Sequence, residues 1–383
     1  MLAVLKPTAV NSVLAEVRAL QADGGKVVSL MRGEPDFTTP AHITEAAIKA
    51  LQSGRTTYPD NRGEIGLRTA VAAKLQRIDG VTYDPASEIL ITDGATLGVY
   101  ASLMTLLNPG DAILLPDPIY DAYQSPIRLA GGQAIAVKST LINGRFALTR
   151  EALEEACTPS TRVLLLNTPW NPVGTVFRED ELKDIADFVE SRNLTLISDE
   201  IYEAITYDGR DHISPAKFLR DRCVVVNSFS KTYAMTGWRL GYCAAPKHIL
   251  DTMFLVLQQS SRGPATFIQD AGQAALNGPQ DAVDKMRAEY TNRRAQVIEA
   301  LKNIPNVSVL PPEGGFFAMI DIRGLTQDSN TVRRRLLEDH GIVVMHGAAY
   351  GPGGEGTLRV SFGSGGDNLT QGLNLLKTGL GAL

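Results

Sequence analysis

The chain has 383 residues, 44% hydrophobic and 21% charged, with a formal net charge of −5 at pH 7. That length suffices for one large globular unit or two domains, and the composition is ordinary for a well-packed protein. The negative charge and scattered basic residues argue against a nucleic-acid binder, because phosphate recognition needs clustered Lys and Arg. No apolar run is long enough to span a bilayer, so we expect no membrane partner.

The number and spacing of the cysteines and histidines limit the chemistry that the protein can perform. The N-terminal residues indicate its compartment. Cys157, Cys223 and Cys243 form no C-x-x-C pair, and the five histidines form no HExxH pattern, so no metal site is expected. The start of the chain lacks the basic region and uninterrupted apolar stretch of a secretory signal. We therefore expect a cytoplasmic protein. The one short basic cluster, residues 333–335, is expected to be a solvated helix face.

Short apolar runs alternate with amphipathic stretches between residues 41 and 278. The expected helices include 96–107 and 179–191, and the expected strands are 88–92, 112–115, 134–137, 162–166, 194–197, 223–226 and 238–242. Apolar strands separated by amphipathic helices predict a three-layer α/β/α fold with a mostly parallel sheet. In such sheets ligands bind outside the carboxyl ends of the strands.

The pattern changes after Pro279. Residues 280–303 predict one long amphipathic helix, followed by a mixture of short strands and a helix. We expect a large domain at 41–280 and a smaller α+β domain made of 1–40 and 281–383.

Polar segments follow several of the expected strands. The residues 93–96, Asp-Gly-Ala-Thr, lead into a helix whose free N–H groups can bind an anion. Tyr120 can lie flat against a planar ligand, although a loop tyrosine more often only packs. Asn167 and Asn171 can donate hydrogen bonds to a phenolate or carboxylate, or only belong to a stiff proline-rich loop. Asp199 can pair with a protonated ring nitrogen, with Tyr202 beside it, or only cap the next helix.

The strongest segment is 227–241, NSFSKTYAMTGWRLG, which follows an apolar strand. Lys231 can form a Schiff base with an aldehyde if burial or nearby positive charge lets it lose its proton. Ser228, Ser230 and Arg239 suit a phosphate. Alone, Lys231 would be read as a surface lysine, but with Asp199 one strand earlier the set predicts pyridoxal 5′-phosphate (PLP). Near the C-terminus, Arg359 in TLRVSFG needs an anion if it faces inward and nothing if it faces outward.

Together these segments resemble the class I/II aminotransferases, the aspartate-aminotransferase-like PLP enzymes of fold type I. The resemblance covers nearly the full chain. Its motifs, in order, are GEPDF (33–37), Tyr58 to Arg68, DGAT (93–96), PDPIYDAY (116–123), NTPWNPVG (167–174), SDEIY (198–202), SFSKTYAMTGWRLGY (228–242), GGFF (314–317) and LRVSFG (358–363).

The resemblance implies a role for each matching position. Lys231 would be the Schiff-base lysine and the base that moves the substrate's α-proton. Arg359 would bind the α-carboxylate, helped by Asn171 and the Gly33 backbone. The implied cofactor-binding residues are Ala95, Thr96, Tyr120, Asn171, Asp199, Tyr202, Ser228, Ser230, Lys231, Arg239 and Tyr58.

The resemblance also implies a homodimer in which Tyr58 reaches the phosphate of the neighbouring subunit. Thr96 stands where some dicarboxylate-specific relatives carry lysine, which weakens the case for aspartate as the main substrate. Arg262 lies in a segment that runs near the dimer interface in relatives. It either meets a substrate's distal carboxylate across the dimer or makes interface salt bridges, and the second role is the more usual.

The expected function is therefore a PLP-dependent aminotransferase that moves an amino group between an amino acid and a 2-oxo acid by a ping-pong mechanism. A PLP-dependent C–S lyase or other eliminase is the alternative, because the same anchoring residues serve both reactions. A non-catalytic effector sensor is disfavoured, since Lys231 and Asp199 are both present and little chain precedes GEPDF to hold an added DNA-binding domain. The sequence identifies neither the amino donor nor the acceptor.

Overall fold

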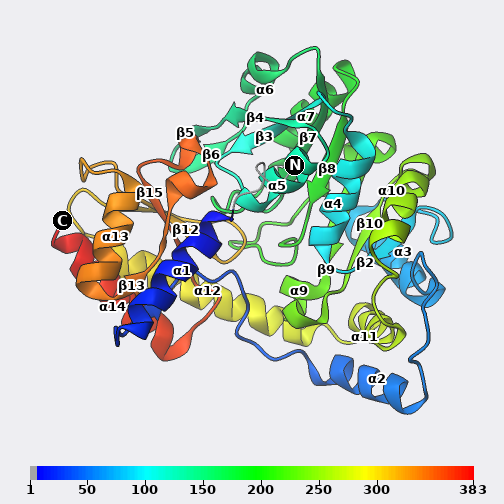
Figure 1. The fold of residues 1–383 in the computed structure, drawn as a ribbon, viewed down its shortest axis with the longest axis horizontal. Coiled ribbons are helices and arrows are strands. Elements are labelled where there is room, and N and C mark those ends of the chain that lie inside the picture. The colour runs from blue at the N-terminus through cyan, green and yellow to red at the C-terminus, as the bar shows by residue number, and fades with distance from the viewer. Residues whose placement is uncertain (1–6) are drawn as a thin grey trace.

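The computed structural model describes residues 7–383, and its largest feature is a seven-stranded sheet (Figure 1). The strands are β2 (Ile89–Thr92), β3 (Ala112–Asp117), β4 (Gln133–Lys138), β7 (Thr161–Asn167), β8 (Thr195–Asp199), β9 (Cys223–Ser228) and β10 (Gly241–Ala244). Their order is β2-β10-β9-β8-β7-β3-β4. Strand β10 is antiparallel to both of its neighbours, and the other pairs are parallel. The predicted α/β fold with a mostly parallel sheet is thereby confirmed.

Both faces of this sheet are covered by helices. In β7, Val163 and Leu165 face one helical layer while Leu164 and Leu166 face the other, since successive side chains alternate between faces. The first layer comprises α4 (Ala95–Leu106), α5 (Gln124–Leu129) and α10 (Lys247–Ser260). The second comprises α2 (Ala41–Gln52), α3 (Ile65–Asp79), α6 (Arg150–Ala156), α7 (Glu179–Ser191), α8 (Ala216–Leu219) and α11 (Thr266–Asn277). Each buried Leu, Ile or Val contributes about 1.5–3 kcal/mol, so this core fixes the strand ends that carry the site.

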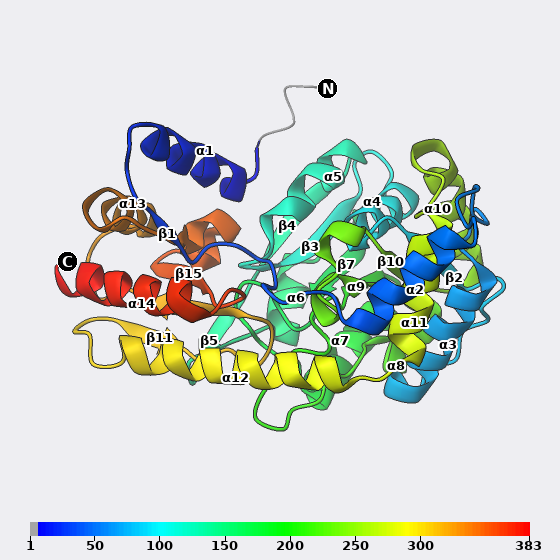
Figure 2. The same cartoon turned by 90° about the horizontal axis from the view of Figure 1, so that it is seen from below.

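A second group of elements lies to one side of the large sheet (Figure 2). Its antiparallel sheet has the order β11-β12-β15-β14, and a small parallel pair joins β1 to β13. The strands are β1 (Val28–Ser29), β11 (Ser308–Leu310), β12 (Phe317–Asp321), β13 (Ile342–Val343), β14 (Met345–His346) and β15 (Thr357–Ser361). The helices are α1 (Ala9–Ala22), α12 (Asp281–Leu301), α13 (Ser329–His340) and α14 (Gly366–Gly381). A separate hairpin pairs β5 (Thr140–Ile142) with β6 (Arg145–Ala147).

Two expectations from the sequence are wrong in detail. The strand expected at 238–242 begins only at Gly241, because residues 236–238 form a 3-10 turn and Arg239 has a left-handed φ of 56°. Arg333 is not on a solvated helix face. It is 2% exposed and donates hydrogen bonds to Glu16 and Asn330, whereas Arg334 is exposed. In the part of the chain that the structure describes, no helix combines the length and apolar character needed to cross a membrane.

Candidate active site

A cavity of about 420 Å³ opens at the carboxyl ends of β7, β8 and β9. It brings together nearly all the site residues predicted from the sequence, which come from both groups of elements. Those lining it are Gly33, Ala95, Thr96, Tyr120, Asn171, Asp199, Tyr202, Ser228, Ser230, Lys231, Arg239 and Arg359. Tyr58 is the exception: it does not line the cavity, and it is 86% exposed.

Lys231 lies on a short helix, α9 (Phe229–Thr232), directly after β9. The Ser228 hydroxyl accepts a hydrogen bond from the Ser230 N–H at 3.2 Å and so caps this helix. The Lys231 amine donates to the Gly33 carbonyl at 2.5 Å. Burial lowers the pKa of Lys231 to about 8, and the cations of Arg239 and Arg359 act in the same direction. The amine therefore loses its proton far more easily than a surface lysine, as a carbonyl-binding lysine must.

Asp199 ends β8 as a buried carboxylate. It accepts a hydrogen bond from the Tyr123 hydroxyl at 2.6 Å and one from the Ile201 N–H at 3.3 Å. Burial nevertheless raises the pKa of Asp199 to about 6. A carboxylate held this way favours a cationic partner inside the cavity. The sequence analysis did not assign Tyr123 a role, although it lies within the PDPIYDAY motif.

The start of α4 forms a cup of backbone N–H groups with the chemistry that suits an anion. The first N–H groups of a helix have no carbonyl partners within it, so those of Ala95 and Thr96 are available to a ligand. A Cβ atom on Gly94 would lie 2.5 Å from Nη2 of Arg239, and one on Gly241 would lie 2.8 Å from the Ala95 nitrogen. Glycine is therefore needed at both positions for the cup and the guanidinium to approach each other. Backbone donors, serine hydroxyls and a guanidinium together suit a phosphate.

Arg359, on β15, is 3% exposed and lacks a carboxylate partner among the residues that the structure describes. Its guanidinium donates to the Asn171 side-chain oxygen at 3.2 Å and to the Met31 carbonyl at 3.0 Å. It also lies 4.0 Å from the centre of the Phe317 ring. Its Nε is buried without an acceptor. A buried guanidinium without a counterion is costly, so this site favours an anionic ligand.

Asparagine and tyrosine side chains complete the walls of the cavity. The Asn167 side-chain oxygen accepts a hydrogen bond from the Asn171 N–H at 2.7 Å, which fixes the position of Asn171. Tyr202 is buried and packs edge-on against Phe317, with ring centres 6.1 Å apart. Tyr120 remains 37% exposed. Both tyrosines line the cavity.

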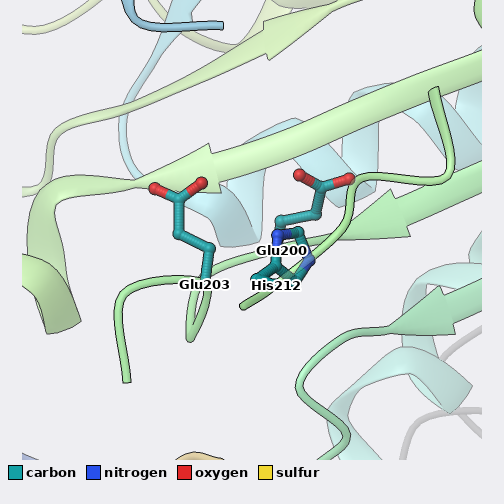
Figure 3. A group of neighbouring side chains, drawn as sticks. All are labelled: Glu200, Glu203 and His212. Carbon is teal, nitrogen blue, oxygen red and sulfur yellow. The ribbon is translucent and has the colours of Figure 1, made fainter. Parts of the chain in front are cut away.

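A second polar cluster, which no sequence motif indicated, is not among the residues that line the cavity. Figure 3 shows its three side chains. Ligand atoms of Glu200, Glu203 and His212 lie within 4.8 Å of one another. Lys74 forms an ion pair with Glu203 and donates a hydrogen bond to the Tyr242 hydroxyl at 2.8 Å. Burial lowers the pKa of His212 to about 4. Since Lys74 already supplies a cation to Glu203, we interpret the cluster as a structural ion-pair network.

Comparison with known proteins identifies the class to which this fold and site belong. The model of the family "Aminotransferase class I and II" matches residues 25–373. The chain therefore belongs to the class I and II aminotransferases, a PLP-dependent family. It is an aminotransferase itself, since relatives with this activity match it over nearly their full length.

Three similar proteins illustrate the range of this family. A probable N-acetyl-LL-diaminopimelate aminotransferase of Bacillus subtilis is 38% identical, covering 94% of this chain and 90% of its own. Aromatic-amino-acid aminotransferase 2 of Thermococcus litoralis is 37% identical, covering 92% and 91%. The solved structure of a single mutant of Thermus thermophilus aspartate aminotransferase has a TM-score of 0.93 and 32% identity, covering 99% and 98%. Their names differ in substrate, so the substrate of this chain has to be inferred from its own site.

Proposed function

We propose that this aminotransferase binds PLP in the cavity through Lys231 and transfers an amino group from an amino acid to a 2-oxo acid in two successive half-reactions. The observation that carries the proposal is that a desolvated lysine and a buried arginine without a counterion, Lys231 and Arg359, line the same cavity. One suits a carbonyl group and the other a carboxylate. An amino acid reacting with an aldehyde cofactor requires both.

The residues present fit PLP. The cup at Ala95 and Thr96, with Ser228, Ser230 and Arg239, would hold its phosphate. The raised pKa of Asp199 indicates that the surrounding groups do not fully stabilise its buried negative charge. A protonated ring nitrogen would stabilise that charge. Tyr202 and Asn171 would donate hydrogen bonds to the ring oxygen, and Tyr120 would stack on the ring. When bound, PLP supplies an aldehyde that combines with amines and a ring that takes up the electrons of a broken bond at Cα.

The remaining residues would position the substrate and move its proton. Arg359 binds the α-carboxylate through two parallel hydrogen bonds, with Asn171 and the Gly33 backbone beside it. That contact holds the Cα–H bond near Lys231. Once the amine of Lys231 is free and neutral, it takes the proton from Cα and delivers it to the cofactor. Its lowered pKa suits a group that must both accept and return a proton near neutral pH.

We also propose a homodimer, a cytoplasmic location and two domains. The 86% exposure of Tyr58 supports a role for its hydroxyl at the phosphate of a neighbouring subunit. The three cysteines are free, which fits a reducing compartment. The proposed domains are 41–280 and 1–40 with 281–383. The two main hydrophobic cores, each gathered around one of the two sheets, support this division, and residues such as Met319 and Tyr202 pack where the proposed domains meet.

A half-reaction screen tests the proposal. The PLP-loaded enzyme is mixed with single amino acids in the absence of a 2-oxo acid, and the cofactor absorbance is followed. At least one amino acid should convert the cofactor to its amine form, and adding a 2-oxo acid should restore the original spectrum. If no amino acid changes the spectrum, the proposal is wrong. Steady ammonia release without a 2-oxo acid would indicate the eliminase alternative instead.

A further inference from the structure

Two short segments line the cavity but have no role in the mechanism proposed above. One is the start of α1 and the residue before it, with Thr8, Val10 and Asn11. The other is 121–126, just after Tyr120, apart from Tyr123, which bonds to Asp199. The groups that would hold the phosphate, the ring and the α-carboxylate lie elsewhere on the cavity wall. These two segments are therefore available to contact the substrate's side chain.

Asp121 is the residue in these two segments that carries a carboxyl group. Its Oδ2 accepts a hydrogen bond from the Ala9 N–H at 2.8 Å, while its Oδ1 is buried without a partner. No Lys, Arg or His of the described residues 7–383 forms an ion pair with it. Burial raises the pKa of Asp121, and the cation of Arg359 acts in the opposite direction. Asp121 is thus a desolvated carboxyl group within electrostatic reach of the arginine that would bind the substrate.

Each cation on the cavity wall already has a partner in the proposed function. Among the described lining residues, only Lys231, Arg239 and Arg359 carry positive charge. Under the proposed function they serve the aldehyde, the phosphate and the α-carboxylate. A second carboxylate on the substrate would find no free cation among these lining residues, and Asp121 is the lining carboxyl group without a role in the proposed mechanism.

We propose that Asp121 determines specificity by excluding amino acids with a second carboxylate, so that the preferred substrates have uncharged side chains. This inference rests on the proposed function, because it assumes that Arg359 holds the α-carboxylate. The neighbouring wall residues Val10, Ala122 and Pro126 offer apolar contacts to such a side chain. Like charges about 7 Å apart in a protein site repel strongly enough to lower affinity by about tenfold or more.

Binding of two unreactive acids tests this proposal without relying on turnover. Pentanoate and glutarate have the same carbon chain, but glutarate carries a second carboxylate. Their Kd values are measured by calorimetry on the PLP-loaded enzyme. We expect pentanoate to bind at least about tenfold more tightly than glutarate. In Asp121→Asn, which retains a side-chain oxygen for the Ala9 N–H, this preference should fall by about tenfold.

Four further variants make the outcome decisive. Asp211→Asn removes one negative charge from an exposed position outside the cavity and should leave the preference unchanged. Asp121→Glu retains the charge and should retain most of the preference, which separates charge from folding effects. Equal binding of the two acids by the unmodified enzyme, or tighter glutarate binding that is lost in Arg262→Ala, overturns the inference. If Arg359→Ala does not weaken pentanoate binding, it is the proposed function that fails.

Discussion

Replacing Asp199 with asparagine should stabilise the enzyme without cofactor while impairing it with cofactor. Burial raises the pKa of Asp199 from 3.8 to about 6 in the folded protein. The folded state therefore binds this proton more tightly than the unfolded state, and stability falls as the pH rises from about 4 to about 6. At about 1.4 kcal/mol per pKa unit, the ionised carboxylate costs about 3 kcal/mol above pH 6. Asparagine removes that cost and still accepts the Tyr123 hydrogen bond.

Urea unfolding of both cofactor-free proteins at pH 5 and pH 8, at equal protein concentration, measures this effect. The advantage of Asp199→Asn should be about 3 kcal/mol at pH 8 and about half of that at pH 5. Asp211→Asn, at an exposed position, is the control for the removal of one negative charge. With PLP bound, Asp199→Asn should lose activity because a neutral amide cannot stabilise a protonated ring nitrogen. A variant that is less stable than the unmodified protein at pH 8 would refute the reasoning.

Three further predictions follow from the site and from the network beside it. Because the pKa of Lys231 is about 8, we expect the cofactor-free enzyme to capture PLP faster as the pH rises through 8. Stopped-flow absorbance measures this rate, and a rate that stays flat between pH 7 and 9 would contradict the prediction. Arg359→Ala should retain the cofactor absorbance but lower kcat/KM for the amino donor by about 100- to 1000-fold, because it removes a buried charged contact to the substrate. An unchanged kcat/KM would show that another residue binds the α-carboxylate. Lys74→Met should destabilise the protein by about 3–5 kcal/mol in chemical denaturation, since Glu203 is left buried without its cation. Adding Glu203→Leu to this variant should recover most of the lost stability. A double variant no better than the single one would show that the pair is not the cause.

The repeating parts of the fold could be predicted from the sequence. Apolar runs such as 162–166 identify strands that are buried on both faces, and the amphipathic pattern at 179–191 matches α7 residue for residue. The sequence predicts too early a start for the strand after Lys231, because apolar Trp238 and Leu240 continue the hydrophobic pattern of a strand through residues that form a turn. The turn and the left-handed backbone at Arg239 interrupt the strand there, and neither is visible in the hydrophobic pattern.

Contacts between distant residues could not be predicted in the same way. Tyr123 bonds to Asp199 across 76 positions of sequence, and no local pattern indicates that pairing. Arg333 is buried because Glu16, on the N-terminal helix, packs beside it. Asp121 likewise belongs to the cavity because the fold brings the start of α1 against it. The candidate cofactor residues were identifiable because they belong to motifs whose roles the family resemblance implies. Asp121 lies in one of these motifs, PDPIYDAY, but the resemblance implies no role for it.

The proposed function depends most directly on a covalent link between Lys231 and PLP. Reduction of the loaded enzyme with borohydride, followed by digestion and mass spectrometry, locates that link directly. We expect a phosphopyridoxyl group on Lys231 and on no other lysine. A label on a different lysine, or no label on an enzyme that has bound PLP, would contradict it.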